Sequence, residues 1–164
     1  MAIITTGGFS SEQLLLEESV LIFPSFGLPE AVELGEIAMD MALDRALPIT
    51  VEVQMGGWTV FHVSLPGATE KHDSWIERKA RVVLATEHST MYERVKAEEE
   101  GIDWYTHYNR PEETHAIHGG AIPIRVSGAG LQGILLISGL PQVEDHLLGI
   151  EIMTEFLARK GETE

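Results

Sequence analysis

The sequence contains no cysteine and few positively charged residues. Disulfide bonds, thiolate metal centres and cysteine nucleophiles are therefore excluded. Lys and Arg total 11 against 26 for Asp and Glu, which gives a formal net charge of -15. Because such a chain and a phosphate backbone repel each other, the composition argues against nucleic acid as a partner.

Long hydrophobic runs are missing as well. No run approaches the roughly 20 apolar residues of a membrane-spanning helix, and residues 1–9 lack the basic and apolar regions of a signal peptide. We therefore expect no membrane association and a cytoplasmic location. The 164 residues, 44% of them hydrophobic, suffice for one core, so the sequence predicts a single domain over 1–164.

Apolar residues with helical spacing mark the beginning of the chain. Ser10 and Gln13 have the spacing of a capping box at the start of a short helix that includes Leu21. Pro29 suits the first turn of a second helix. Gly35 inside this second helix costs about 1 kcal/mol relative to Ala, so we expect it to permit the close approach of another element.

Two candidate strand pairs follow. Residues 49–64 alternate around Gly56-Gly57, and residues 121–138 surround a second glycine-rich turn, so each segment predicts a hairpin. Pro123 favours an edge position or the opening of its strand. The strand over 58–64 carries large residues on both sides, and we expect both of its faces to be largely covered.

Helices are expected around these hairpins. One begins at Asp73 or Ser74, a short one begins at Ser89 or Thr90, and a closing helix spans 143–157, whereas 98–113 is a loop with about one helical turn. Strands joined by tight turns run antiparallel. The sequence therefore predicts an α+β fold, with an antiparallel sheet of about five strands flanked by helices.

Polar residues that could carry chemistry occur in three clusters. His115 and His118 lie in a loop that enters a strand, a context that favours backbone hydrogen bonds over metal ligation. Asp145 and His146 open the last helix, where capping of the free amides is the simpler interpretation and catalysis the alternative.

The third cluster is the basic segment 78–81, which holds Arg78, Lys79 and Arg81. It could hold a carboxylate or phosphate, or lie in surface salt bridges. Phosphate-loop, dinucleotide-binding and serine-hydrolase motifs are absent from the sequence. The residues alone therefore assign neither catalytic residues nor a metal site.

Four separate motifs give the chain a resemblance to a known family. They are Phe61 to Thr69, Trp75 to Thr90, His118 to Val126 and Ser138 to His146. In order and spacing they resemble the UPF0303 family, whose members are often called haem-degrading domain-containing proteins. More remotely, the chain is similar to the HbpS, GlcG and PduO C-terminal group.

The resemblance implies a profilin-like sheet with helices on both faces and a homo-oligomer, dimer or higher. It also implies haem or a related tetrapyrrole as the possible cofactor, because some members of the remoter group bind one. Ser74 and Thr90 depart from the residues common in relatives, which are Asn or Asp and Ser, respectively.

From these observations we expect a protein that binds a small anionic molecule or a tetrapyrrole, with no turnover assigned. The family-like motifs coincide with the convergent polar groups, so the expected ligand-binding residues are Arg78, Lys79, His118, Gly119, Gly120, Asp145 and His146. One alternative is a haem-modifying or hydrolytic enzyme that uses His146 or His118 as a base. The second alternative is a structural or assembly protein.

Overall fold

The computed structural model describes residues 7–163, and in them the secondary structure alternates between helices and hairpins. The elements in chain order are α1 (Ser11–Val20), β1 (Ile22–Phe23), α2 (Leu28–Asp44), β2 (Thr50–Met55), β3 (Trp58–Ser64), α3 (Lys71–Thr86), α4 (Thr90–Glu100), α5 (Trp104–His107), β4 (Ala121–Val126), β5 (Gly130–Ser138) and α6 (Gln142–Thr163).

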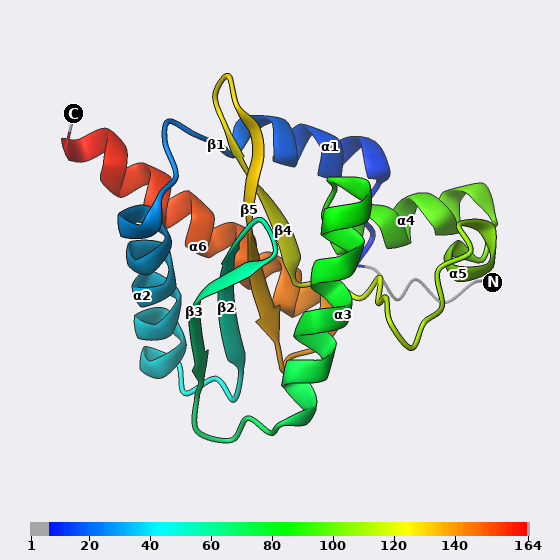
Figure 1. The fold of residues 1–164 in the computed structure, drawn as a ribbon, viewed down its shortest axis with the longest axis horizontal. Helices are drawn as coiled ribbons and strands as arrows, with labels where there is room; N and C mark the ends of the chain where they lie inside the picture. The colour runs from blue at the N-terminus through cyan, green and yellow to red at the C-terminus, as the bar shows by residue number, and fades with distance from the viewer. Residues whose placement is uncertain (1–6, 164) are drawn as a thin grey trace.

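The strands form one sheet in the order β1-β4-β5-β2-β3. The pairs β4–β5, β5–β2 and β2–β3 are antiparallel, whereas β1 pairs with β4 in parallel. Helices α2 and α6 cover one face of the sheet and α3 covers the other (Figure 1). The predicted α+β fold, a sheet of five strands with helices on both faces, is confirmed, but the sheet is mixed and not purely antiparallel, because β1 runs parallel to β4.

Alternation along the central strand β5 divides the core into two layers. Leu135 and Ile137 are buried with α2 and α6, whereas Ile134 and Leu136 pack against α3. Successive side chains of a strand point to opposite faces, so one apolar run serves both layers. This explains why β5 reads as a nearly continuous hydrophobic segment.

The sequence analysis missed strand β1, because a strand of two residues is too short to show an alternation of apolar and polar side chains. It pairs with Arg125 and Val126 of β4 and does not reach Pro123. Within residues 7–163, no strand therefore lies beside Pro123 on the side of β4 that faces away from β5. This edge position agrees with the sequence analysis, which expected it because proline has no backbone N–H.

Strand β3 forms the opposite edge, and the expectation that both of its faces are largely covered is wrong. Its residues are exposed or half-buried, and Trp58 is 60% exposed. A strand at a sheet edge has a neighbour on one side only, so its large side chains gain less cover than those of a central strand. Within α2, Gly35 faces the Phe61 ring of β3, which confirms the expected close approach.

The helices agree with the sequence in type and differ at their ends. The helix α3 begins at Lys71, two residues before the first predicted start, and α6 continues beyond the predicted end at Leu157. The element α5 is the single helical turn expected within 98–113. No helix within the described residues is long and apolar enough to cross a membrane.

Substitution of Gly35 by Ala is expected to lower the free energy of unfolding by about 2 kcal/mol. The added methyl group overlaps the Phe61 ring. Severe overpacking costs ~3 kcal/mol, which outweighs the ~1 kcal/mol gained in helix propensity. Urea denaturation measures the difference. Gly161→Ala is the matched control, because beyond its own stretch of helix no described atom lies within 4 Å of the added Cβ. Equal stability of Gly35→Ala and the wild type would contradict the packing argument.

Candidate functional site

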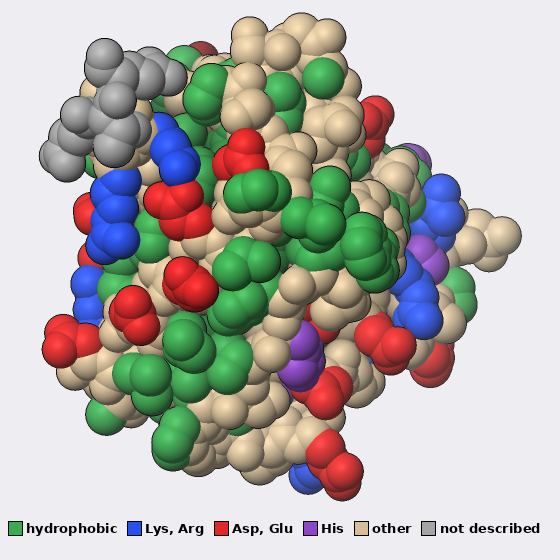
Figure 2. Space-filling model, turned by 60° about the vertical axis from the view of Figure 1, so that its left-hand side comes forward, with side chains coloured by type: hydrophobic (Ala, Val, Ile, Leu, Met, Phe, Trp, Pro, Cys, Tyr) green, Lys and Arg blue, Asp and Glu red, His purple; other side chains and the backbone are tan. Residues whose placement is uncertain are grey.

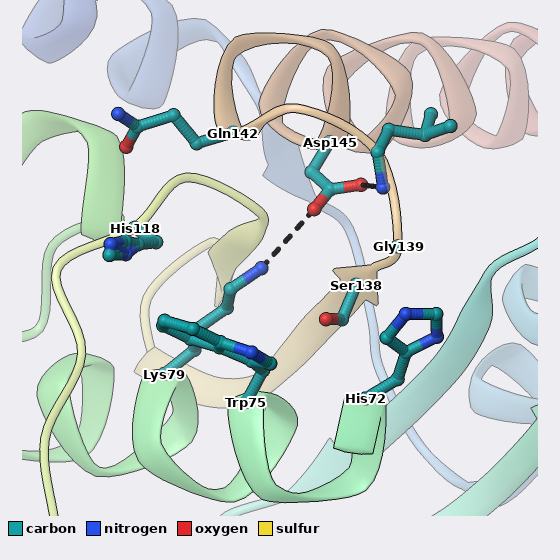
Figure 3. Close-up of a pocket in the computed structure, with 9 residues that line it drawn as sticks. His72, Trp75, Lys79, His118, Ser138, Gly139, Gln142 and Asp145 are labelled. Carbon is teal, nitrogen blue, oxygen red and sulfur yellow. Dashed lines mark hydrogen bonds and ion pairs between the residues drawn. The ribbon is translucent and has the colours of Figure 1, made fainter. Parts of the chain in front are cut away.

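A cavity of about 380 Å³ opens where the start of α3 meets the end of β5 and the start of α6 (Figure 3). This size lies within the range of roughly 300–1,000 Å³ that is typical of small-molecule sites. We call it the His118 cavity. It is lined by His72, Trp75, Lys79, His118, Ser138, Gly139, Leu140, Gln142 and Asp145.

The helix α3 supplies one wall of the His118 cavity. His72, Trp75 and Lys79 are three and four residues apart, so successive turns place them on one side of the helix. In Figure 3, Trp75 lies between His72 and His118. Trp75 and the two histidines are half-buried, whereas Lys79 is fully enclosed. The cavity therefore has an aromatic rim and a charged floor.

The floor is an ion pair between Lys79 and Asp145. The Lys79 Nζ lies 3.3 Å from Asp145 Oδ2 and donates to the carbonyl oxygen of Ile137 at 2.9 Å. The second carboxylate oxygen, Asp145 Oδ1, accepts from the backbone N–H of Leu140 at 3.0 Å. These bonds join α3, the end of β5 and the first turn of α6 at one point.

Burial shifts the pKa of both members of the pair. It lowers the pKa of the Lys79 ammonium, because the attraction of Asp145 does not offset the loss of hydration. It raises the pKa of Asp145 from 3.8 to about 6, although the Lys79 charge and the backbone N–H groups of Leu140 and Gly139 favour the carboxylate. Asp145 therefore changes its protonation close to neutral pH.

His118 presents a neutral imidazole at the rim. Burial lowers its pKa to about 4, and the charges of Arg94, Lys79 and Arg78 act in the same direction. Its ring meets the Trp75 ring edge-on, with 4.5 Å between centroids. Its Nδ1 is enclosed without a hydrogen-bond partner among the residues described, which leaves Nε2 as the nitrogen that a ligand can meet.

The two glycines after His118 let this loop approach the floor. A Cβ on Gly119 would overlap the backbone of Gln142, and a Cβ on Gly120 would overlap the carbonyl oxygen of Ile137 and lie 2.8 Å from Lys79 Nζ. Gly120 also has a φ of 126°, which side-chain-bearing residues rarely adopt. The Gly-Gly pair is therefore required for the loop to pass between α6 and β5.

The structure brings together five of the seven residues that the sequence analysis assigned to the site. Lys79, His118 and Asp145 line the His118 cavity. Gly119 and Gly120 form the backbone directly behind them, and the Gly119 N–H donates to Gln142 Oε1 at 3.3 Å.

Arg78 and His146 do not line this cavity. The Arg78 guanidinium stacks 4.4 Å from the Trp75 ring and donates to the carbonyl oxygen of Glu112 at 2.6 and 2.9 Å, so it fastens the loop before β4 to α3. His146 is fully buried, with its Nε2 2.7 Å from Glu17 Oε1 of α1. Its position one residue after Asp145 turns it to another side of α6.

Six lining residues escaped the sequence analysis, namely His72, Trp75, Ser138, Gly139, Leu140 and Gln142. The helical spacing of His72 and Trp75 relative to Lys79 is a signal that could have found the first two. Ser138 and Gln142 carry no such signal, because the strand end and the helix start meet the cavity only in the folded chain.

Within residues 7–163, no group of three or more His, Cys, Asp or Glu side chains is placed so that it could hold a metal ion. His115 and His118 do not form one site. The Nδ1 of His115 lies 2.8 Å from the hydroxyl of its neighbour Thr114, whereas His118 lies in the cavity.

Lys79→Met is expected to make the stability of the protein more dependent on pH. Without the ammonium, the buried Asp145 carboxylate has no cation, so its pKa rises further above its unfolded value of 3.8. An acid whose pKa is higher in the folded state than in the unfolded state stabilises the fold fully at pH values below its unfolded-state pKa. This stabilisation is lost as the pH rises through its folded-state pKa. The variant should lose about 3 kcal/mol relative to the wild type at pH 8 and much less at pH 5.

Urea denaturation at the two pH values checks this expectation. Lys71→Met, at the exposed start of α3, is the control for loss of one positive charge. The double variant Lys79→Met with Asp145→Asn has no titrating group at the floor and should lose the added pH dependence. A Lys79→Met penalty that is equal at pH 5 and pH 8 would show that Asp145 does not titrate as described.

Comparison with known proteins places the chain in a family. The family described as haem degrading protein HbpS-like matches residues 26–153. A UPF0303 protein of Streptomyces avermitilis is 37% identical over 147 residues, which are 90% of each chain.

Two solved structures share the fold. The Ybr137w protein matches with a TM-score of 0.85 and 24% identity, over 96% of this chain and 92% of that one. The PduOC:Heme complex matches with a TM-score of 0.66 and 18% identity, over 79% of this chain and 94% of that one. The motifs, the family match and the close relative agree, and the chain belongs to the HbpS-like haem degrading family and to the UPF0303 proteins.

Proposed function

We propose that the protein binds haem, or a related tetrapyrrole that carries a metal, in the His118 cavity. The observation that carries the proposal is the state of His118. A neutral imidazole with one unengaged nitrogen is the form in which histidine binds a metal, and haem iron is commonly held by such a histidine. His118 has this form at pH 7 and lies at the rim of a cavity of ligand size.

The other lining residues suit a flat ligand with polar edges. Trp75 and Leu140 offer apolar surface at the rim, and His72 has a second enclosed Nδ1 without a partner among residues 7–163. His118 would hold the metal. His72 is the second histidine that lines the cavity. The bound group would supply the metal chemistry, and the protein would supply its orientation and partial exclusion of water. The family description and the heme complex of the PduOC relative point to the same ligand class.

Titration of the purified protein with haem is expected to shift the Soret band and to saturate at one haem per chain. His118→Ala should weaken the affinity at least about tenfold, which corresponds to ~1.4 kcal/mol. His107→Ala is the control, because His107 is exposed on α5 and does not line the cavity. An unchanged Soret band would refute haem binding. Equal affinity of His118→Ala and the wild type would refute the assignment of His118.

In this proposal the protein holds haem and does not degrade it. The bound Soret band should persist for hours with a reductant present. Loss of the band with formation of a bile-pigment product would instead establish the haem-modifying enzyme, and loss of activity in His118→Ala would identify its base. A cytoplasmic location also stays a prediction of the sequence, which cell fractionation tests.

The protein also assembles as a homo-oligomer in this proposal. A net charge of -15 opposes association, so an interface must bury apolar surface to form. Figure 2 shows hydrophobic side chains gathered on the side where α2 and β3 lie. Leu28, Val32 and Leu43 of α2 and Trp58 of β3 are exposed. The edge strand β3 offers unpaired backbone groups at the same side.

Light scattering at micromolar concentration is expected to give a mass that is a multiple of 18.1 kDa. Trp58→Glu should shift the mass towards the monomer, because a charge would replace the largest exposed apolar side chain of the β3 edge. Leu16→Glu is the matched control, since Leu16 is 67% exposed but lies on α1. A monomeric wild type would contradict the oligomer and rule out the assembly-protein alternative. Dissociation by Leu16→Glu alone would place the interface elsewhere.

A further inference from the structure

The floor of the His118 cavity contains a hydroxyl group that the protein itself leaves free. Ser138 ends β5 and is only 3% exposed. Alternation along β5 turns its side chain to the face that α3 covers, the side of Ile134 and Leu136. Its Oγ has no hydrogen-bond partner within residues 7–163, yet it is not one of the unpaired atoms that the fold seals from solvent. In Figure 3 the hydroxyl points into the cavity.

The Lys79 ammonium lies next to this hydroxyl and has one N–H group to spare. An ammonium carries three N–H groups. Two of them donate, one to the carbonyl oxygen of Ile137 at 2.9 Å and one to Asp145 Oδ2 at 3.3 Å. The Ile137 carbonyl belongs to the peptide bond that leads into Ser138, so the ammonium and the hydroxyl share one end of the cavity. Two donors at the floor therefore have no acceptor within the described part of the chain.

The surroundings of His118 are positively charged, although the chain as a whole has a net charge of -15. The charges of Arg94, Lys79 and Arg78 all lower the pKa of His118, which shows that three cations act on this imidazole. The 22-residue helix α6 begins at Gln142 in the cavity wall, and its first turn adds the positive end of the helix dipole. The unengaged donors thus lie in a field that favours an anion.

A second cavity, of about 510 Å³, lies between α3 and the β2–β3 hairpin and has the opposite charge. Glu52, Asp73 and Glu77 line it against one guanidinium, that of Arg81. It shares no lining residue with the His118 cavity. Because its carboxylates repel an anion, we expect an acidic ligand to occupy the His118 cavity alone, with one molecule per chain.

Asp145 is the one acid among the described residues that line the His118 cavity, and it does not exclude an incoming carboxylate. Its Oδ1 accepts from the Leu140 N–H and its Oδ2 from Lys79, so donors already engage both oxygens. Burial raises the pKa of Asp145 to about 6, and a second carboxylate beside Lys79 shifts Asp145 further towards its protonated form. A proton taken up by Asp145 then relieves the repulsion between the two acids.

The shape of the lining defines which anion fits. A carboxylate has two oxygens, which match the two free donors at the floor, whereas a phosphate dianion would bring more charge and more acceptors than the floor satisfies. Above the floor, Trp75 and Leu140 offer apolar surface. The ligand is therefore an organic acid that has a flat apolar body and a carboxylate at one end.

We infer that the floor of the His118 cavity binds the carboxylate of an aromatic or tetrapyrrole acid, with one oxygen accepting from Lys79 Nζ and the other from Ser138 Oγ. For haem, the group is one of its side-chain carboxylates, and to this extent the inference rests on the proposed function. The two donors belong to the protein alone, so they also bind the carboxylate of a smaller ring that carries a short acid chain.

Calorimetric titration with 3-phenylpropionate is expected to show saturable binding of one molecule per chain. Two matched probes separate the causes. The neutral 3-phenylpropanamide has nearly the same shape without the charge, and 3-phenylpropylammonium has the opposite charge. Both should bind at least about tenfold more weakly than the acid, because a hydrogen bond to a charged acceptor is the stronger one. Absence of saturation with the acid overturns the inference, and so does equal affinity of the amide.

Ser138→Ala locates the carboxylate. It should weaken binding of 3-phenylpropionate about fivefold, because one of two hydrogen bonds to the acid is lost. Urea denaturation should give the same stability as the wild type, since the hydroxyl has no partner within residues 7–163. Ser127→Ala is the control, because Ser127 is exposed in the turn between β4 and β5. Unchanged affinity of Ser138→Ala for the acid would overturn the assignment of Ser138.

Haem titration of the same variant separates the inference from the proposed function. Ser138→Ala should weaken haem binding about threefold, a smaller loss than for the small acid, since the rest of the ligand keeps its contacts. The position of the bound Soret band should stay the same, because His118 is intact. Saturable binding of 3-phenylpropionate without any haem binding would refute the proposed function and support the carboxylate site. Haem binding that is equal in Ser138→Ala and the wild type, without saturation by 3-phenylpropionate, would overturn the inference and leave haem binding in place.

Discussion

The buried contact between Lys79 and Asp145 connects the three elements that form the floor of the candidate site. It joins a helix from one face of the sheet to the first turn of the helix that packs on the other face. An ion pair removed from water is a poor source of net stability, because the lost hydration offsets the attraction. Its contribution is geometric, because the ammonium has one acceptor in β5 and one in α6 and therefore connects these two elements to α3.

The sequence predicted most of the fold because the fold is built from long periodic segments. Residues 49–64 alternate strictly enough to identify one hairpin, the glycine-rich turn within 121–138 identifies the other, and their tight turns require antiparallel pairing. The two-residue strand β1 is too short to have a period, and the exposure of β3 depends on its place at the sheet edge. Both features depend on how the strands assemble into the sheet, and the local sequence pattern does not show this assembly.

The candidate site was less predictable for the same reason. Lys79 lies between two arginines in the sequence, and this setting is typical of an exposed basic surface. In the structure the arginines bind the carbonyl oxygens of Glu112 and Thr114, whereas Lys79 is enclosed. Asp145 and His146 are adjacent in sequence but face different parts of the molecule. Burial of a polar side chain is decided by tertiary contacts, and the family motifs identified these residues without showing their directions.

The helix α3 contributes to both cavities through different stripes of its surface. His72, Trp75 and Lys79 face one, and Asp73, Glu77 and Arg81 line the other. Thermodynamic reciprocity requires that if occupancy of one cavity alters affinity at the other, the influence returns by the same factor. The sixteen residues of α3 thus contribute side chains to two chemically unlike cavities.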